Sequence, residues 1–371
     1  MFLSSRGYRN QACAMAKLML LLVVFIVFTA VFVERILVFR QKLFADRHLP
    51  PKRLPNCELI PGIDNGAEDI EILPNGLAFI SSGLKYPGLK VFEPHKGGQI
   101  LLMNLKSESP RPVELKIEGG FDLDSFNPHG ISIYMENSDS IYLFVVNHPE
   151  GNSAVEIFKF FQDEKYLLYL RTVTNQLLSS VNDILAVGPE HFYATNDRYF
   201  RSETVSIYLE VFWGFSWTNV VYYSPKKVKE VASGFYSANG INMSPDGKFI
   251  YVADILDHSI QVFQKMSNMN LTPVKALKFE TILDNISVDR KTGDLWLGCH
   301  PNAAKLISYD PKDPPGSEIL LVKDILSDKP KIITVYVDDG TIIQGSSVAV
   351  YFERHLIVGT VFQKALYCHM P

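Results

Sequence analysis

The sequence has few cysteines, and they are not spaced for metal or redox chemistry. It contains four cysteines in 371 residues and no Cys-x-x-Cys pair, which disfavours a zinc site or a thioredoxin-like centre. A Gly-x-Ser-x-Gly sequence is also missing, so the chain lacks the nucleophile turn of an α/β-hydrolase. With a net charge of −4 and no long run of Lys or Arg, it has no stripe that would neutralise phosphates. We therefore expect neither a serine nucleophile nor a nucleic-acid partner.

The longest apolar stretch lies close to the N-terminus. Residues 18–33 contain no charged side chain and are preceded by Arg6, Arg9 and Lys17, which is the order of basic and apolar regions in a signal sequence. No small-x-small cleavage site follows, and residues 36–39 can lengthen the stretch toward a membrane span. We therefore expect the segment to be retained as an anchor, with cleavage and free secretion as the alternative.

This N-terminal pattern sets the expected domain organisation. Residues 1–40 are predicted to form an extension with a retained signal or anchor helix, and residues 41–371 a single folded domain. Met15 also resembles a start site, so residues 1–14 form an alternative extension. The protein is therefore expected in the secretory pathway, either membrane-associated or extracellular with its hydrophobic segment retained.

The rest of the chain contains a repeated phrase typical of strands. A residue with a side-chain oxygen or imidazole is followed by an apolar run, a turn and a second apolar run, and aromatic residues make up 12% of the chain. Successive copies begin about 45 to 60 residues apart, the length of one four-stranded propeller blade. The copies begin at Glu68, His129, Asn182, Asn239 and Asp284, and a degenerate sixth begins at Thr334. The pattern therefore predicts an all-β propeller.

The leading residues of these copies predict a metal site. Equivalent positions of successive blades converge on the axis of a propeller, and a ring of carboxylate and amide oxygens suits a hard cation, most naturally Ca²⁺. Asp and Asn beside strands are more often turn residues, and for any single position that alternative stays open. Repetition in register favours the metal site for the whole set. The predicted ring consists of Glu68, Asn182, Asn239, Asp284 and Asn285.

Two cysteines lie at the ends of the folded region. Cys57 begins it, and Cys368 lies three residues before the end of the chain. A disulfide between them would tie the first strand to the last, and the secretory start favours it. Two unpaired, buried cysteines are the alternative.

Long strings of the sequence resemble the paraoxonase/arylesterase family. The resemblance extends from about residue 36 to the end of the chain, and it rests on whole strings rather than on single motif letters. The strings are Gly66–Phe79, Phe126–Ser132, Val145–Pro149, Ser180–Ile184, Ala238–Asn242, Leu283–Asp289, Trp296–Asn302 and Lys364–Cys368.

The resemblance implies a six-bladed β-propeller with two Ca²⁺ ions in a central tunnel. The five residues of the predicted ring would bind the catalytic calcium ion. Asp69, Asp183 and the backbone carbonyl of Ile131 would bind a structural one. His129 and His148 match the proton-transfer pair proposed for the family. The cysteines also match, with Cys57 and Cys368 as a disulfide and Cys299 as a free thiol.

Family members hydrolyse lactones and aryl esters, and some hydrolyse organophosphates. The resemblance therefore implies a calcium-dependent hydrolase in which Ca²⁺ polarises the carbonyl and stabilises the oxyanion. His129 would take a proton from water while His148 orients it or relays the proton, and a competing assignment lets Asp284 activate the water. The alternatives are an organophosphate or other ester hydrolase on this scaffold, and a non-enzymatic, calcium-stabilised propeller that binds lipid or protein.

Other positions bear on the substrate and on surfaces. Tyr86, Ser237 and His300 are expected to line the substrate pocket, and some relatives have Phe where this chain has Ser237. Residues 199–223 are rich in aromatic side chains, which predicts an interfacial helix on the active-site face that contacts a membrane or lipoprotein; a helix packed on the propeller is the alternative. Asn270 is the predicted glycosylation site.

Overall fold

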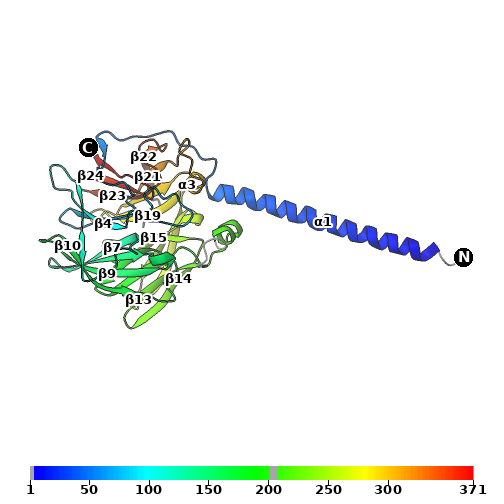
Figure 1. Ribbon diagram of the computed structural model, residues 1–371, viewed down its shortest axis with the longest axis horizontal. Helices are drawn as coiled ribbons and strands as arrows, with labels where there is room; N and C mark the ends of the chain where they lie inside the picture. The colour runs from blue at the N-terminus through cyan, green and yellow to red at the C-terminus, as the bar shows by residue number, and fades with distance from the viewer. Residues whose placement is uncertain (1–3, 201–206, 371) are drawn as a thin grey trace.

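The computed structural model describes residues 4–200 and 207–370 (Figure 1). Within these residues, six β-sheets form a ring, and a long helix extends from one side of it. The all-β, six-bladed propeller and the N-terminal apolar helix predicted from the sequence are therefore confirmed.

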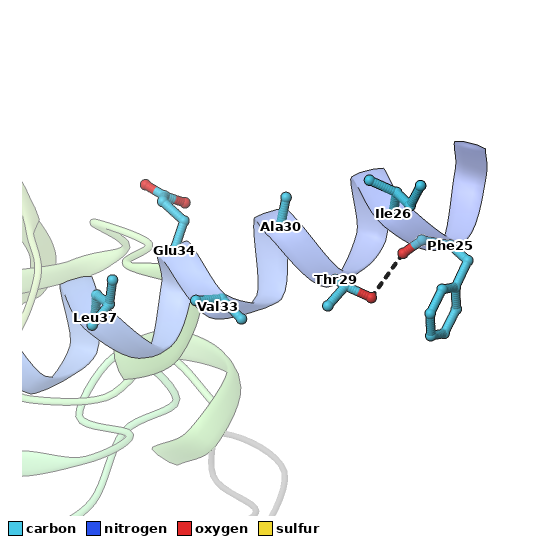
Figure 2. A pocket seen from close by; sticks show the side chains of 7 residues that line it. All are labelled: Phe25, Ile26, Thr29, Ala30, Val33, Glu34 and Leu37. Atoms are coloured by element: carbon cyan, nitrogen blue, oxygen red, sulfur yellow. Dashed lines mark hydrogen bonds between the residues drawn. The ribbon is translucent and has the colours of Figure 1, made fainter. Parts of the chain in front are cut away.

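Helix α1 (Ser4–Lys42) carries the apolar N-terminal stretch. Its side chains from residue 13 to residue 33 are exposed, and Figure 2 shows Phe25, Ile26 and Val33 along this part of the helix. By length and composition, residues 13–42 are suited to cross a membrane. The helix is thus compatible with either a signal sequence or an anchor.

The blades follow one another along the chain. The first is β2 (Ile70–Ile72), β3 (Leu77–Ser82), β4 (Gln99–Asn104) and β5 (Pro112–Glu114). The second is β7 (Pro128–Asn137), β8 (Ser140–Asn147), β9 (Ala154–Phe161) and β10 (Tyr166–Val173), with β6 (Lys116–Glu118) parallel to β10. The third is β11 (Val181–Gly188), β12 (His191–Asn196), β13 (Thr218–Ser224) and β14 (Lys227–Phe235).

The remaining three blades repeat the four-stranded antiparallel plan. The fourth is β15 (Ala238–Met243), β16 (Phe249–Asp254), β17 (Ser259–Lys265) and β18 (Leu271–Lys278). The fifth is β19 (Ile282–Val288), β20 (Leu295–His300), β21 (Ser317–Lys323) and β22 (Lys331–Asp338). The sixth is β23 (Ser346–Phe352), β24 (His355–Thr360), β25 (Leu366–His369) and β1 (Cys57–Leu59). The short helices are η1 (Pro149–Gly151), η2 (Ile207–Val211), η3 (Ile255–Asp257) and α3 (Ala303–Ile307).

The sixth blade closes the ring with strands from both ends of the chain. Strand β1 pairs antiparallel with β25, and Cys57 lies directly opposite Cys368. These two cysteines form the predicted disulfide, across a sequence separation of 311 residues. The ring is therefore held by backbone hydrogen bonds and by one covalent bond at the same place.

Apolar layers between neighbouring blades form the core. Alternate residues of each strand point into these layers, and one layer between the first two blades contains Phe79, Phe158 and Phe160. The rings of Phe79 and Phe160 are 4.8 Å apart and nearly perpendicular, a favourable aromatic geometry. The packing fixes each blade against the next and thereby orients the inner strands.

Two predictions of local structure are corrected. The degenerate copy at Thr334 is not an inner strand, because Thr334 lies within β22, the outer strand of the fifth blade, and the inner strand of the sixth blade is β23. The sixth blade begins with Ser346 and Ser347, which lack the carboxylate or amide that marks other copies. The repeat signal is therefore missing there.

The aromatic segment at residues 199–223 is only partly helical. It contains the single π-helical turn η2 and a short continuation to Trp213, whereas Thr218 already begins β13. Residues 201–206 of the predicted segment lie outside the described residues. The helix is therefore shorter than the sequence predicts, because the end of the aromatic run is used as a blade strand.

Candidate active site

The predicted site residues lie at the start of the inner strands, where the strand pairing shifts register. The shifts fall at Pro128/Ile131, Val181/Ile184, Ala238/Ile241, Leu283/Ile286 and Ser346/Val348. A shift of this kind adds an unpaired residue and turns its side chain out of the normal alternation. These intervals contain His129, Asn182, Asp183, Asn239, Asp284 and Asn285. The irregular strand ends therefore direct polar side chains to the axis of the ring.

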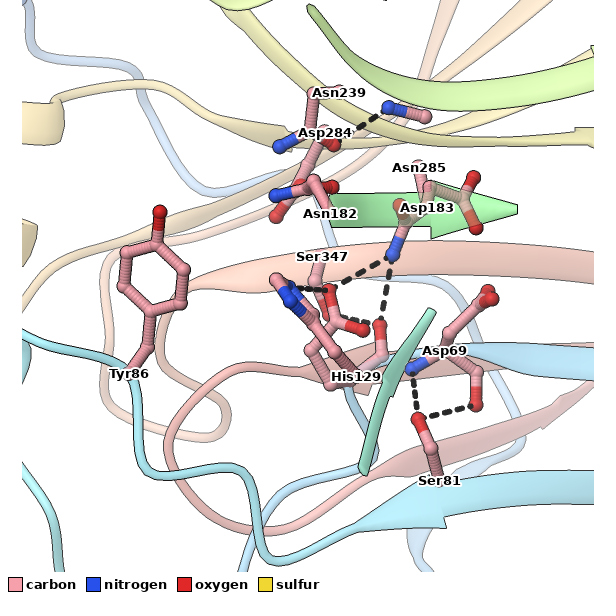
Figure 3. Close-up of polar contacts among 12 residues, drawn as sticks. Asp69, Ser81, Tyr86, His129, Asn182, Asp183, Asn239, Asp284, Asn285 and Ser347 are labelled. Carbon is pink, nitrogen blue, oxygen red and sulfur yellow. Dashed lines mark hydrogen bonds and ion pairs between the residues drawn. The ribbon is translucent and has the colours of Figure 1, made fainter. Parts of the chain in front are cut away.

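Glu68, just before β2, contacts residues of this group, and Figure 3 shows two of its partners, His129 and Asn285, near Ser347. The side-chain amide of Asn285 donates to Oε1 of Glu68 at 3.0 Å and to its backbone carbonyl at 3.1 Å. Nε2 of His129 lies 3.6 Å from the same Oε1. Ser347 Oγ donates to the carbonyl of Glu68 at 2.7 Å. Residues from the second, fifth and sixth blades thus meet at Glu68, which leads into the first blade.

Several buried oxygens of this group have no hydrogen-bond partner among the described residues. They are Oε2 of Glu68, Oδ1 of Asn182 and Oδ1 of Asn285. Buried polar atoms are almost always paired, and an unpaired oxygen is a ready ligand for a hard cation. In the part of the chain that the structure describes, no three His, Cys, Asp or Glu side chains alone are arranged to hold a metal. The available donor set is therefore a mixture of carboxylates and amides, which fits Ca²⁺.

Asp69 and Asp183 connect neighbouring blades below this group. Oδ2 of Asp69 accepts a hydrogen bond of 2.8 Å from the backbone N–H of Ile131, and Oδ2 of Asp183 accepts one of 2.7 Å from Ile241. Each carboxylate also accepts from the N–H of the residue that follows it. The structure thus brings Asp69 to the N–H of Ile131, whereas the predicted second calcium site uses the carbonyl oxygen of Ile131, and the role of these residues as ligands stays a prediction.

Glycines after two site residues allow the inner strands to approach closely. A Cβ on Gly130 would lie 2.5 Å from Oδ1 of Asp183, and one on Gly240 would lie 2.5 Å from the backbone oxygen of Asp284. Neither distance is sterically tolerable, so these two positions require glycine for reasons of space. The polar ends of adjacent inner strands can therefore converge around a small volume.

The concentration of buried acid raises the pKa values of several groups. Burial raises the pKa of Glu68 well above its usual value, and the charge of Asp284 raises it further. Burial also raises the pKa of Asp69 to about 6 and that of Asp183 well above its usual value. Like charges in one buried space are unfavourable unless a cation compensates them. The electrostatics of the protein alone therefore favour a bound cation.

His129 and His148 are in direct contact beside Glu68. Nδ1 of His129 lies 3.0 Å from Nε2 of His148, and Nδ1 of His148 lies 3.4 Å from Oγ of Ser153. Burial, reinforced by His148, lowers the pKa of His129 to about 3, and burial lowers the pKa of His148 to about 4. Both rings are therefore neutral at physiological pH, and in the protein without a bound cation each is a weaker base than an exposed imidazole.

His300 holds one of the predicted calcium ligands. Its Nε2 lies 2.8 Å from Oδ2 of Asp284, and its Nδ1 is buried without a partner among the described residues. The contact fixes one oxygen of Asp284.

Sequence reasoning missed a polar cluster next to the histidine pair. Tyr86 donates a hydrogen bond to Oδ2 of Asp197, and the guanidinium of Arg198 lies 5.1 Å from the centre of the Tyr86 ring. Burial raises the pKa of Asp197, but Arg198 and hydrogen bonds from Ser180 and Tyr86 outweigh it and hold the pKa below its usual value. The sequence did contain a signal for this cluster. The charged pair Asp197 and Arg198 comes directly after β12, in the blade that also supplies Asn182.

These groups surround a cavity of about 220 Å³. Its polar wall includes Glu68, His129, Asn182, Asn239 and Asp284, together with the expected pocket residues Tyr86, Ser237 and His300. Leu43, Val211 and Ile307 form part of its apolar wall. His148 and Asn285 do not line the cavity, but they contact His129 and Glu68, which do.

The remaining predicted positions lie apart from the cavity. Cys299 is a buried free thiol in β20, and burial raises its pKa well above the usual value, so it has little thiolate character. Asn270 is exposed, and its Oδ1 accepts a hydrogen bond from Nζ of Lys229. An exposed position is compatible with glycosylation, which stays a prediction.

Comparison with known proteins shows the family and the fold. The arylesterase family model matches residues 49–370. The chain is 57% identical to serum paraoxonase/arylesterase 2 of Gallus gallus over 337 residues, which cover 91% of this chain and 95% of that protein. It is 54% identical to serum paraoxonase/arylesterase 1 of Homo sapiens over 333 residues, which cover 90% and 94%.

Among solved structures, a luciferin-regenerating enzyme matches with a TM-score of 0.52 and 12% identity, over 86% of this chain and 94% of that one. A putative gluconolactonase matches with a TM-score of 0.51 and 10% identity, over 84% and 91%. At such low identity these two likenesses show the fold alone. The family match and the sequence identities go further, and they show that this chain belongs to the arylesterase family of ester- and lactone-hydrolysing enzymes.

Proposed function

We propose that this protein is a calcium-dependent hydrolase of lactones and aryl esters. The observation that carries the proposal is the set of unpaired, buried oxygens on Glu68 and Asn182, which line the cavity, and on Asn285, which donates a hydrogen bond to Glu68. These oxygens suit a hard cation, and together with Asn239 and Asp284 they would hold it against the substrate pocket. A bound calcium ion would supply a positive charge that polarises the scissile carbonyl and stabilises negative charge in the transition state.

A second calcium ion is proposed near the first, at residues that do not line the cavity. Asp69, Asp183 and the carbonyl of Ile131 would hold it. Asp69 and Asp183 already cross-link neighbouring blades through hydrogen bonds to backbone N–H groups, and their raised pKa values fit a position that needs a cation. This ion would therefore stabilise the ring rather than contact the substrate, giving two ions in each chain.

The histidine pair is proposed to move the proton of the attacking water. His129 borders the cavity, and its neutral ring has one nitrogen with a lone pair that can accept the proton. Behind it, His148 contacts Nδ1 of His129 and can orient that ring or take the proton onward. Asp284 is the competing base, and it is held by His300.

Replacing His129 by Gln separates these two assignments. The variant keeps hydrogen-bonding capacity but removes the base, so we expect kcat for lactone hydrolysis to fall by about 100-fold or more while calcium content is unchanged. His95→Gln, at an exposed position in a loop, is the matched control. Near-normal lactone hydrolysis by His129→Gln, with calcium still bound, would transfer the role of base to Asp284.

Contact with a membrane or lipoprotein surface is proposed for the face that carries α1. Phe212, directly after η2, packs against Phe32 and Phe39 of α1 at ring distances of 5.8 and 6.1 Å. Exposed aromatic side chains of the same segment include Trp213, Phe215 and Trp217, a composition typical of lipid interfaces. The apolar helix and the aromatic segment therefore form one continuous surface, which supports a secreted or membrane-bound protein with a retained N-terminal segment.

Flotation of the protein with phospholipid vesicles tests the membrane proposal. Val27→Arg places a charge in the middle of the exposed apolar stretch and should abolish co-flotation. Leu123→Arg changes an equally exposed apolar residue on the propeller and should have no effect. Equal loss of flotation in both variants would contradict a role for α1.

The catalytic proposal is tested by hydrolysis of a medium-chain aliphatic lactone and of phenyl acetate. Activity should disappear when EGTA removes calcium and return when calcium is added back. Metal content is measured in the same samples, so that a tightly held ion is not mistaken for independence of metal. A folded, calcium-loaded protein that hydrolyses neither substrate would overturn the proposal and leave another ester as the substrate.

A further inference from the structure

A pair of histidines lies on the surface of the sixth blade, outside the site described above. His355 is the first residue of β24, and His369 is the last residue of β25. The two residues are direct partners in the antiparallel pairing, so their side chains project from the same face of the sheet. Their ring centres are 5.4 Å apart, with the planes at 84°.

This distance fits two ligands of one metal ion. Two imidazoles bound to a tetrahedral Zn²⁺, each with a Zn–N distance of about 2.0–2.1 Å, have ring centres about 5 Å apart. Directly opposed positions on antiparallel strands provide that separation without movement of the backbone. We propose that His355 and His369 form a surface site for a borderline transition-metal cation such as Zn²⁺, with water completing the coordination.

Neighbouring residues hold one ligand in the orientation that such a site needs. The hydroxyl of Tyr367 forms a hydrogen bond with Nδ1 of His355, and the two rings stack at 5.5 Å. Metal-binding histidines commonly use one ring nitrogen for a hydrogen bond and the other for the metal, because the bond fixes the ring. When Nδ1–H of His355 donates to the hydroxyl oxygen of Tyr367, Nε2 carries the lone pair that is available to the ion.

The backbone around the second ligand is also fixed. The N–H of His369 donates to the carbonyl of Asn56, and Met370 exchanges hydrogen bonds with Arg354 in the turn before β24. The carboxylate of Glu353 in that turn is close enough to affect His355, whose pKa is lowered by burial and by His369 while Glu353 acts in the opposite direction. The two histidines thus lie at strand ends held by backbone hydrogen bonds. The nearby carboxylate of Glu353 favours a bound cation.

The pair lies at the end of the blade remote from the active site. Strand β24 runs from His355 to Thr360, and Val361, just beyond its other end, lines the catalytic cavity. In Figure 1 the C-terminus is on the side of the propeller opposite α1. Metal binding at the pair can therefore be measured without using the proposed lactonase activity.

Isothermal titration of the full-length, calcium-saturated protein with ZnCl₂ tests the site. One equivalent of Zn²⁺ should bind to the unchanged protein, and His355→Gln or His369→Gln should weaken this binding by about tenfold or more. His95→Gln removes a single exposed histidine from another surface and should leave the isotherm unchanged. Tyr367→Phe should weaken binding by a smaller factor, because only the orientation of His355 is lost.

Unfolding midpoints without zinc, measured for every variant, show whether a change comes from lost ligands or from a lost fold. His369→Gln is the safer variant because His369 is exposed. An isotherm of the folded double variant His355→Gln/His369→Gln that is identical to that of the unchanged protein would overturn the proposal. Equal weakening by His95→Gln would do so as well, because it would indicate unspecific binding.

Discussion

The side-chain amide of Asn285 donates a hydrogen bond of 3.0 Å to Oε1 of Glu68, a residue 217 positions earlier in the chain. Asn285 belongs to the fifth blade, and Glu68 leads into the first. The bond therefore connects two blades that flank the sixth. It uses the nitrogen of Asn285 and one oxygen of Glu68, and it leaves Oδ1 of Asn285 and Oε2 of Glu68 unpaired. The two residues thus fix each other while keeping one oxygen each for a cation.

Replacing Glu68 by Gln should therefore reduce calcium binding and activity together. The change removes one negative charge from the ring and keeps the size of the side chain. We expect lactone hydrolysis to fall by about 100-fold or more, with partial recovery at high calcium concentration. Calcium content and kcat/KM are measured on the same preparation.

Glu136→Gln, at an exposed position of β7, is the matched control for that variant and should behave like the unchanged protein. If Glu68→Gln retained full calcium content and full activity, the assignment of Glu68 as a ligand would be wrong.

Loss of the disulfide should destabilise the ring without changing the site chemistry. Replacing Cys57 and Cys368 by Ser removes a cross-link that spans 311 residues, and disulfides contribute roughly 2–5 kcal/mol to the free energy of unfolding. Urea titration should show this decrease, while kcat/KM at low temperature stays close to normal. Cys13→Ser changes an exposed thiol on α1 and serves as the control. Equal midpoints in the two proteins would mean that the hydrogen bonds between β1 and β25 suffice.

Asp254 should make the stability of the fourth blade depend on pH. Burial raises its pKa to about 6, above the value of about 3.9 in an unfolded chain. The stabilising contribution is therefore complete below about pH 4 and is lost as the pH rises through about 6. Compared with Asp254→Asn, the unchanged protein should lose about 1–2 kcal/mol of unfolding free energy between pH 5 and pH 7.5.

Urea titrations at both pH values, in saturating calcium, give that difference for Asp254→Asn and for the exposed control Asp139→Asn. Effects of pH on the calcium sites are common to all three proteins and cancel in the comparison. A difference between Asp254→Asn and the unchanged protein that does not vary with pH would show that Asp254 is not protonated on folding.

Gly359→Ala should damage the propeller where β24 passes the segment before β2. A Cβ at Gly359 would lie 2.0 Å from the carbonyl oxygen of Ala67, directly before Glu68. The backbone has to move, so we expect a loss of about 3 kcal/mol or more in unfolding free energy together with weaker calcium binding. Gly97→Ala is the control, because the nearest atom to its Cβ would be 3.9 Å away. Equal stability of the two variants would contradict the close contact between the blades.

The site residues could be predicted because they repeat. Inner strands direct a polar side chain toward the axis where they begin. The same pattern, a polar residue followed by apolar ones, therefore appears at Asn182, Asn239 and Asp284. The structure brings these three residues to one cavity. Asp197 could not be found in this way, because it follows the second strand of its blade and forms its contacts with Tyr86, 111 positions away. Contacts of that kind depend on tertiary structure and leave no period in the sequence.

The errors at the ends of elements have a similar origin. The start of the sixth blade carries Ser346 and Ser347, and their hydroxyl groups bond to backbone carbonyls of Cys299 and Glu68. Serine in such a position resembles an ordinary turn residue. The repeat pattern therefore places the sixth copy at Thr334 instead of at the start of β23. In the aromatic segment, Thr218 and the residues after it suit a buried strand as well as an interfacial helix, and only the pairing with β12 decides between them.

The closure of the ring has a consequence for biosynthesis. Strand β1 is made early, but its partner β25 follows much later, with Cys57 and Cys368 separated by 311 positions, so β1 has to wait unpaired until the sixth blade has been made. The earlier blades can pack in order as they emerge, since each is formed largely from neighbouring segments. Formation of the Cys57–Cys368 bond therefore marks a closed ring, and a chain without β25 would leave the edges of β1 and β24 unpaired and open to aggregation.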